Sequence, residues 1–71
     1  MVTSDIVIQV NGETRQVSGG LSLNELLASF DLRPEMIVVE HNGDIIRRDR
    51  YPSTTIMDGD TLELVHFVGG G

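Results

Sequence analysis

Hydrophobic and polar residues alternate near both ends of the chain, and this alternation predicts β-strands there. In residues 5–10, every second side chain from Ile6 to Val10 is apolar, which gives a first strand one apolar face. Asn11-Gly12 follows and predicts a tight hairpin, because a type I′ turn needs positive φ at both central positions. Residues 13–17 are therefore predicted to return as the second strand.

A helical spacing replaces the alternation in the next segment. Ser22 and Glu25 form the capping-box pattern that starts a helix, with Ser at the N-cap and Glu three residues later. Arg33-Pro34 is expected to end the helix, because the residue before a proline disfavours helical dihedral angles. Between these signals, apolar residues recur at i, i+3, i+4 and i+7 and predict one buried stripe, formed by Leu23, Leu26, Leu27 and Phe30.

Two further strands are predicted in the middle of the chain. Residues 36–40 form an apolar strand, and Asn42-Gly43 is a second hairpin signal that leads into residues 44–47. Residues 48–55 contain Tyr51-Pro52 and are expected to form a connection that has room for a single helical turn.

The last strand is predicted at residues 61–67, directly after a tight turn at Asp58-Gly59-Asp60. If Leu62 and Leu64 face the helix, period-two geometry puts the intervening side chains on the opposite face, which a single helix leaves uncovered. That face is expected to be an exposed apolar partner site, formed by Val65, Phe67 and Val68. The alternative is that strand curvature hides Phe67 at the rim of the core.

The order of elements, β-β-α-β-β-β, predicts an α+β fold. A hairpin, a crossover helix and later strands imply a mixed five-stranded sheet with the helix packed on one face. This arrangement is the β-grasp, or ubiquitin-like, roll. We expect residues 1–68 to form this domain and residues 69–71 to form a flexible tail.

Three glycines, Gly69, Gly70 and Gly71, follow the last strand. Residues without a Cβ atom can pass between closely spaced protein walls, so this tail suits a C-terminal carboxylate that must enter the active site of another enzyme. A frayed terminus or a linker is the other interpretation, because chain ends are commonly disordered.

Composition limits the classes of function. The chain has 71 residues, and its net charge of −6 argues against nucleic-acid binding, because phosphate contacts need basic side chains. Arg47, Arg48 and Arg50 form a small basic cluster, which is either a contact for an acidic partner or a solvated edge strand blunted by charge. Neither a long apolar run nor a basic leader is visible, so we expect a cytoplasmic protein that binds no membrane.

No set of residues suggests catalysis or metal binding. His41 and His66 lack a nucleophile or a second metal ligand at a telling spacing, and we expect both to be structural or solvated. Gly19-Gly20 precedes the helix but lacks the Lys-Ser/Thr pair of a phosphate-binding loop. The absence of cysteine removes disulfides and Cys-based zinc sites. We therefore expect no catalytic residue and no metal site in this chain.

The segment DGDTLELVHFVGGG, residues 58–71, resembles the sulfur carrier proteins of thiamin biosynthesis, the ThiS family. The similarity extends to the length of the chain, the opening Asn-Gly hairpin and the short leucine helix. The resemblance implies that Gly71 is the modified residue. An E1-like adenylyltransferase would use ATP to adenylate its carboxylate, and a sulfur donor protein would then convert the adenylate to a thiocarboxylate. Thiazole synthase would consume this sulfur as it builds the thiazole of thiamin.

The same resemblance implies a carrier that is not itself an enzyme. Gly69 and Gly70 would pass through the active sites of the partners. ATP and Mg²⁺ would be used by the adenylyltransferase, and this chain would bind no cofactor. Two alternatives remain open: the small subunit of molybdopterin synthase, and a ubiquitin-like interaction or modifier domain without thiocarboxylate chemistry.

Overall fold

The computed structural model describes residues 4–67 and contains five strands, one α-helix and two short 3₁₀ helices. The strands are β1 (Asp5–Val10), β2 (Glu13–Ser18), β3 (Ile37–His41), β4 (Asp44–Ile46) and β5 (Thr61–His66). The helices are α1 (Leu23–Ser29), η1 (Pro34–Met36) and η2 (Arg48–Ser53).

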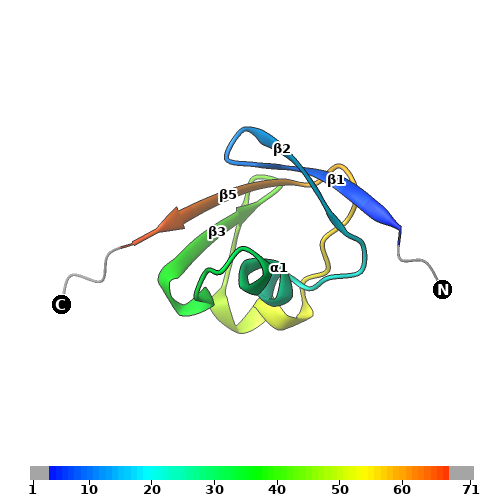
Figure 1. The fold of residues 1–71 in the computed structure, drawn as a ribbon. Coiled ribbons are helices and arrows are strands. Elements are labelled where there is room, and N and C mark those ends of the chain that lie inside the picture. The colour runs from blue at the N-terminus through cyan, green and yellow to red at the C-terminus, as the bar shows by residue number, and fades with distance from the viewer. Residues whose placement is uncertain (1–3, 68–71) are drawn as a thin grey trace.

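The five strands form one mixed sheet in the order β2-β1-β5-β3-β4, and α1 packs across one of its faces (Figure 1). β1 and β5 are parallel, whereas the other neighbouring strands are antiparallel. Both predicted Asn-Gly turns are present, and all four of their residues have positive φ. The predicted β-grasp roll is therefore confirmed. None of the helices in the described part of the chain is long and apolar enough to cross a membrane.

The core lies between the sheet and α1, and the predicted leucine stripe supplies its centre. Burying such side chains is the main favourable term in folding, at about 25 cal/mol per Å² of apolar surface. Phe30 is only half-buried at the end of the stripe, where the Arg15 guanidinium lies 5.3 Å from the centre of its ring. The buried apolar residues are Ile8, Val10, Leu23, Leu26, Leu27, Ile37, Val39, Tyr51, Ile56 and Leu62.

The capping box at the start of α1 is confirmed. The backbone N–H of Glu25 donates to the hydroxyl of Ser22 (3.1 Å), and the backbone N–H of Ser22 donates to the Glu25 carboxylate (2.8 Å). Two backbone donors that the helix cannot satisfy itself are thus paired.

The prediction that Arg33-Pro34 ends the helix is wrong, because α1 already ends at Ser29. Asp31 adopts positive φ (65°) just after the C-cap residue Phe30. Its N–H donates to the carbonyl of Ala28, and the N–H of Leu32 donates to the carbonyl of Leu27, both at 2.9 Å. This pair of bonds is a Schellman motif, which satisfies the last helical carbonyls and reverses the chain before the proline is reached.

Tyr51 is a buried member of the core and was not predicted to be buried. It lies in η2, and its hydroxyl donates a 2.7 Å hydrogen bond to the carbonyl of Ile37 in β3. Burial raises the pKa of the Tyr51 phenol further above neutral pH, so its hydroxyl remains a hydrogen-bond donor. The connection between β4 and β5 is therefore anchored to the sheet.

Leu26→Ala should reduce the free energy of unfolding by about 2–5 kcal/mol, because it leaves a cavity in the centre of the leucine stripe. Urea unfolding followed by circular dichroism measures this change. Met57→Ala is the control, since the Met57 side chain is exposed. Equal stabilities of the two variants would contradict the packing of α1 described above.

Candidate functional site

The C-terminal strand β5 lies in the middle of the sheet, between β1 and β3. Its pairing with β3 extends past its last residue, because the N–H of Phe67 donates to the carbonyl of Met36 (3.1 Å). The C-terminal segment thus follows a backbone position that is fixed by the sheet. The predicted site residues Val68, Gly69, Gly70 and Gly71 lie outside the described residues.

The face of β5 that points away from α1 carries exposed apolar side chains, as predicted. Leu62 is buried against the helix and Leu64 is half-buried. On the opposite face, Val65 is 58% exposed and Phe67 is 43% exposed. The exposure of Phe67 contradicts the alternative in which strand curvature hides this ring. The partner-binding role of both residues stays a prediction.

Two apolar residues from neighbouring strands extend this surface and were missed from sequence. Val38 of β3 lies directly opposite Val65, and Ile45 of β4, which is 71% exposed, lies opposite Glu40. The alternation in β3 was the available signal, because a buried Ile37 and Val39 place Val38 on the uncovered face. We call this surface the open-face patch, formed by Val38, Ile45, Val65 and Phe67.

A like-charged pair borders the open-face patch. Glu40 and Glu63 are directly opposite each other in the antiparallel pairing of β3 and β5. They line, with Val38, Ile45 and Val65, a shallow hollow of about 310 Å³. Like charges in this position are mildly destabilising, so the pair does not serve the stability of the sheet.

Asn11 holds β5 on the β1 side of the sheet. The two strands share only the pairs Gln9–Thr61 and Val10–Leu62. Beyond them, the Asn11 amide accepts from the N–H of Leu64 (2.7 Å) and donates to its carbonyl (3.2 Å). A side chain from the first hairpin turn therefore continues the pairing where the backbone of β1 turns away.

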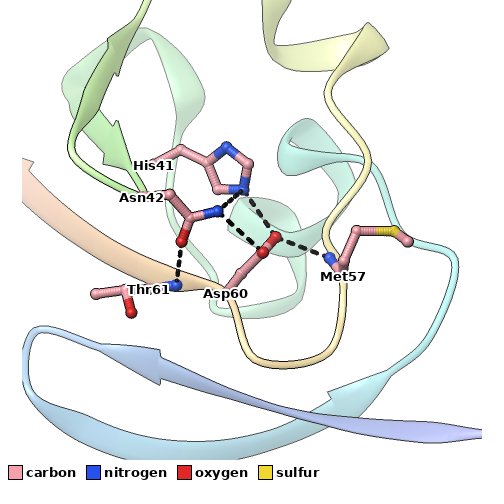
Figure 2. A network of polar contacts seen from close by, with 5 residues as sticks. All are labelled: His41, Asn42, Met57, Asp60 and Thr61. Atoms are coloured by element: carbon pink, nitrogen blue, oxygen red, sulfur yellow. Dashed lines mark hydrogen bonds and ion pairs between the residues drawn. The ribbon is translucent and has the colours of Figure 1, made fainter.

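A second network holds the start of β5 on the β3 side (Figure 2). The Asn42 amide oxygen accepts from the N–H of Thr61 (2.8 Å), and its NH₂ group donates to Asp60 (3.0 Å). Asp60 is the one buried polar residue of the described chain, and its carboxylate also accepts from His41 Nε2 (2.7 Å) and the N–H of Met57 (2.8 Å). This network joins the second hairpin turn to the turn before β5.

His41 is therefore a structural residue, as expected. A carboxylate can only accept, so the bond to Asp60 places a proton on Nε2 of this histidine. His66 lies exposed at the end of β5. Within residues 4–67, no group of three or more metal-ligating side chains comes together.

Hydrogen bonds determine the charge state of Asp60. Burial by itself raises the pKa of this carboxyl, but the bonds from His41, the Met57 N–H and Asn42 outweigh burial and lower the pKa below its usual value. Asp60 is thus ionised at neutral pH, and the three donors are matched by a negative charge.

The lowered pKa makes the fold sensitive to acid. A carboxyl with a lower pKa in the folded state adds stability above its unfolded pKa, and this stability is lost as the pH falls through the folded pKa. We expect Asp60→Asn to lower the free energy of unfolding by about 1–3 kcal/mol near pH 7. The NH₂ group of the new asparagine would face the hydrogen-bond donors that now bind the carboxylate. The difference from the unsubstituted chain should shrink below about pH 4.

Urea unfolding between about pH 7 and pH 3 measures this effect. Asp44→Asn, a change at an exposed aspartate, serves as the control. A difference between Asp60→Asn and the unsubstituted chain that stays constant with pH would contradict the role given to the Asp60 charge.

The sequence and the fold are similar to those of known proteins. The ThiS family model matches residues 8–71, which include the three glycines. The sulfur carrier protein ThiS of Bacillus subtilis is 38% identical over 66 residues, which cover 92% of this chain and all of that protein. The crystal structure of the thiamine biosynthesis protein ThiS from Geobacter metallireducens superposes with a TM-score of 0.80 at 35% identity, over 93% of this chain and all of that one.

A similar domain also occurs within a larger protein. The thiazole synthase of Magnetococcus marinus is 36% identical to this chain over 64 residues. This match covers 90% of this chain but only 20% of that synthase.

Proposed function

The chain belongs to the ThiS family and is a sulfur carrier of thiamin biosynthesis, and from this premise we propose that its reactive group is the Gly71 carboxylate. The family match supports this proposal because it runs to Gly71 itself and includes the whole glycine tail. The Geobacter metallireducens relative is named a thiamine biosynthesis protein, which favours this pathway over the molybdopterin alternative.

The chemistry proceeds by activation of a poor electrophile. A carboxylate resists nucleophilic attack, so an E1-like adenylyltransferase joins the Gly71 carboxylate to the α-phosphorus of ATP and releases pyrophosphate. A sulfur donor protein then supplies sulfur at the oxidation state of sulfide, which attacks the carbonyl and displaces AMP. The product is a C-terminal thiocarboxylate, and thiazole synthase is its acceptor.

The chain itself delivers its C-terminal carboxylate to the partners and does not catalyse the reaction. The metal and nucleotide of the activation step belong to the adenylyltransferase, and Gly69 and Gly70 pass through the narrow active sites. Ordering the three tail glycines, residues 69–71, costs about 1–2 kcal/mol per residue. The open-face patch, together with Val68, provides the contacts with the partner that offset this cost.

Deletion of Gly71 should abolish the modification without changing the fold. Intact-mass spectrometry of the chain co-expressed with its adenylyltransferase and sulfur donor measures the product. We expect a mass increase equal to the exchange of one oxygen for sulfur, and we expect no such increase after the deletion. A thiocarboxylate that persists after the deletion, or material that carries only a carboxylate, would contradict the proposal.

Growth of the source organism without the coding sequence distinguishes thiamin biosynthesis from molybdopterin biosynthesis. Loss of the coding sequence should create a requirement for the thiazole of thiamin, and the full chain should restore growth where the Gly71 deletion does not. A requirement for molybdopterin instead would favour the other pathway.

Phe67→Asp should weaken binding to the adenylyltransferase by about tenfold or more, because it places a charge in the open-face patch. Its melting temperature should change little, since exposed positions contribute little to stability. Calorimetric titration and thermal unfolding measure the two effects. Val7→Asp is a matched control, because Val7 is also exposed and apolar but lies on β1, at the end of the sheet away from Phe67. Equal affinities for both variants would contradict this role of Phe67.

A further inference from the structure

We propose that the surface formed by η2 and by β4, the edge strand of the sheet, binds acidic side chains of thiazole synthase. This inference rests on the proposed function. A hollow of about 360 Å³ lies at this edge. We call it the arginine hollow, and its lining residues are Ile45, Ile46, Arg47, Arg50, Ser53 and Thr54.

Two arginines, Arg47 and Arg50, line the arginine hollow of this acidic protein. The chain has a net charge of −6 and only five basic residues, all arginine, and three of them fall within residues 47–50. Arg47 makes one exposed ion pair with Asp49 (3.5 Å). Among the described residues, no carboxylate lies within 4.0 Å of the Arg48 or Arg50 guanidinium groups.

The fold does not require these charges. The Arg47 side chain is 83% exposed, and exposed ion pairs such as Arg47–Asp49 contribute little to stability. Arg50 makes no ion pair with a described carboxylate, so a carboxylate from a partner would form a new charge pair there. Arginine also suits carboxylates geometrically, since its planar fork can donate two parallel hydrogen bonds.

The backbone of the arginine hollow is already held in place. The Arg50 carbonyl accepts from the hydroxyls of Ser53 (3.2 Å) and Thr54 (2.8 Å). Tyr51, which follows Arg50, is buried and bonded to β3. A partner would therefore meet arginines on a fixed turn, which lowers the entropy cost of binding.

The arginine hollow is continuous with the open-face patch. Ile45 lines the arginine hollow and also the shallow hollow beside Val65. Ile45 lies in β4. A partner that covers the open-face patch as it receives the tail is therefore also next to Arg47 and Arg50. The two surfaces together combine an apolar centre with a charged rim, as specific protein interfaces do.

The charge of the whole chain selects the class of partner. A polyanion such as a nucleic acid would meet a net repulsion from the acidic chain, whereas a few carboxylates on a protein need only the local cluster. Thiazole synthase is the protein we assign, because a domain similar to this chain lies within the thiazole synthase of Magnetococcus marinus. A domain joined to its acceptor in one chain indicates that the two work in contact.

Isothermal titration calorimetry with the complete thiazole synthase of the same organism tests this assignment. The double variant Arg47→Gln/Arg50→Gln should bind about three- to thirtyfold more weakly than the unsubstituted chain at about 0.05 M NaCl, as expected for two lost charge pairs. The difference should shrink at about 0.5 M NaCl, where salt screens exposed charges. The Gly71 thiocarboxylate should still form in the double variant.

The control is Arg33→Glu, which changes the net charge by the same two units as the double variant. Arg33 is 79% exposed and makes a comparable ion pair with Glu35 (3.4 Å), but it lies before η1 rather than at the β4 edge. Its affinity for the synthase should stay within about twofold of the unsubstituted chain. An equal loss for both variants would show an effect of net charge alone and would overturn the assignment.

Three other results would also overturn the assignment of the arginine hollow to thiazole synthase. The double variant could bind the synthase as tightly as the unsubstituted chain does, or it could lose binding only to the adenylyltransferase. The unsubstituted chain could also gain sulfur and yet not bind the synthase. In each of these cases the unsubstituted chain still gains sulfur, so the proposed carrier function stands. If the unsubstituted chain neither gains sulfur with its native partners nor binds the synthase, the proposed function itself is wrong.

Discussion

Two asparagine side chains, one on each side, help to hold β5 between β1 and β3. Asn11 and Asn42 each occupy the first central position of an Asn-Gly turn, where positive φ is needed and asparagine tolerates it. Each also turns its amide toward the backbone of β5, and an amide group offers both the acceptor and the donor that a peptide group would offer. The residues that reverse the two hairpins thus also fix the strand that leads to the tail.

This constraint has a consequence for the uncovered face of the sheet. One helix covers one face, so the outward side chains of β5 and its neighbours stay in contact with solvent. A stable sheet would carry polar side chains there, whereas this sheet carries the open-face patch and the like-charged pair Glu40–Glu63 beside it. Both features cost solubility or stability in the free chain. They are understandable on a surface that spends part of its time covered by a partner.

The local features of the fold follow from the sequence, and the features that depend on distant residues do not. The hairpins, the capping box and the outward face of β5 were predicted because each is encoded within a few adjacent residues. The early end of α1 was missed because aspartate at Asp31 is an uncommon residue for the positive-φ position, where glycine is usual. The pairing of Asp60 with His41 joins residues 19 positions apart, so it requires the completed sheet. Sequence spacing identified Asp58-Gly59-Asp60 as a turn but gave no sign that its last carboxylate is buried.

The central place of β5 also fits the function proposed for the glycine tail of this chain of 71 residues. A tail that followed an edge strand would continue a segment paired on one side only, and inserting it into an active site would compete with that pairing. β5 is paired with β1 and Asn11 on one side as far as Leu64, and with β3 on the other side as far as Phe67. The first half of β5 is thus held on both sides, and its last residues stay paired with β3. This arrangement fits the proposed function, in which the sheet stays intact while the tail enters the active site of a partner.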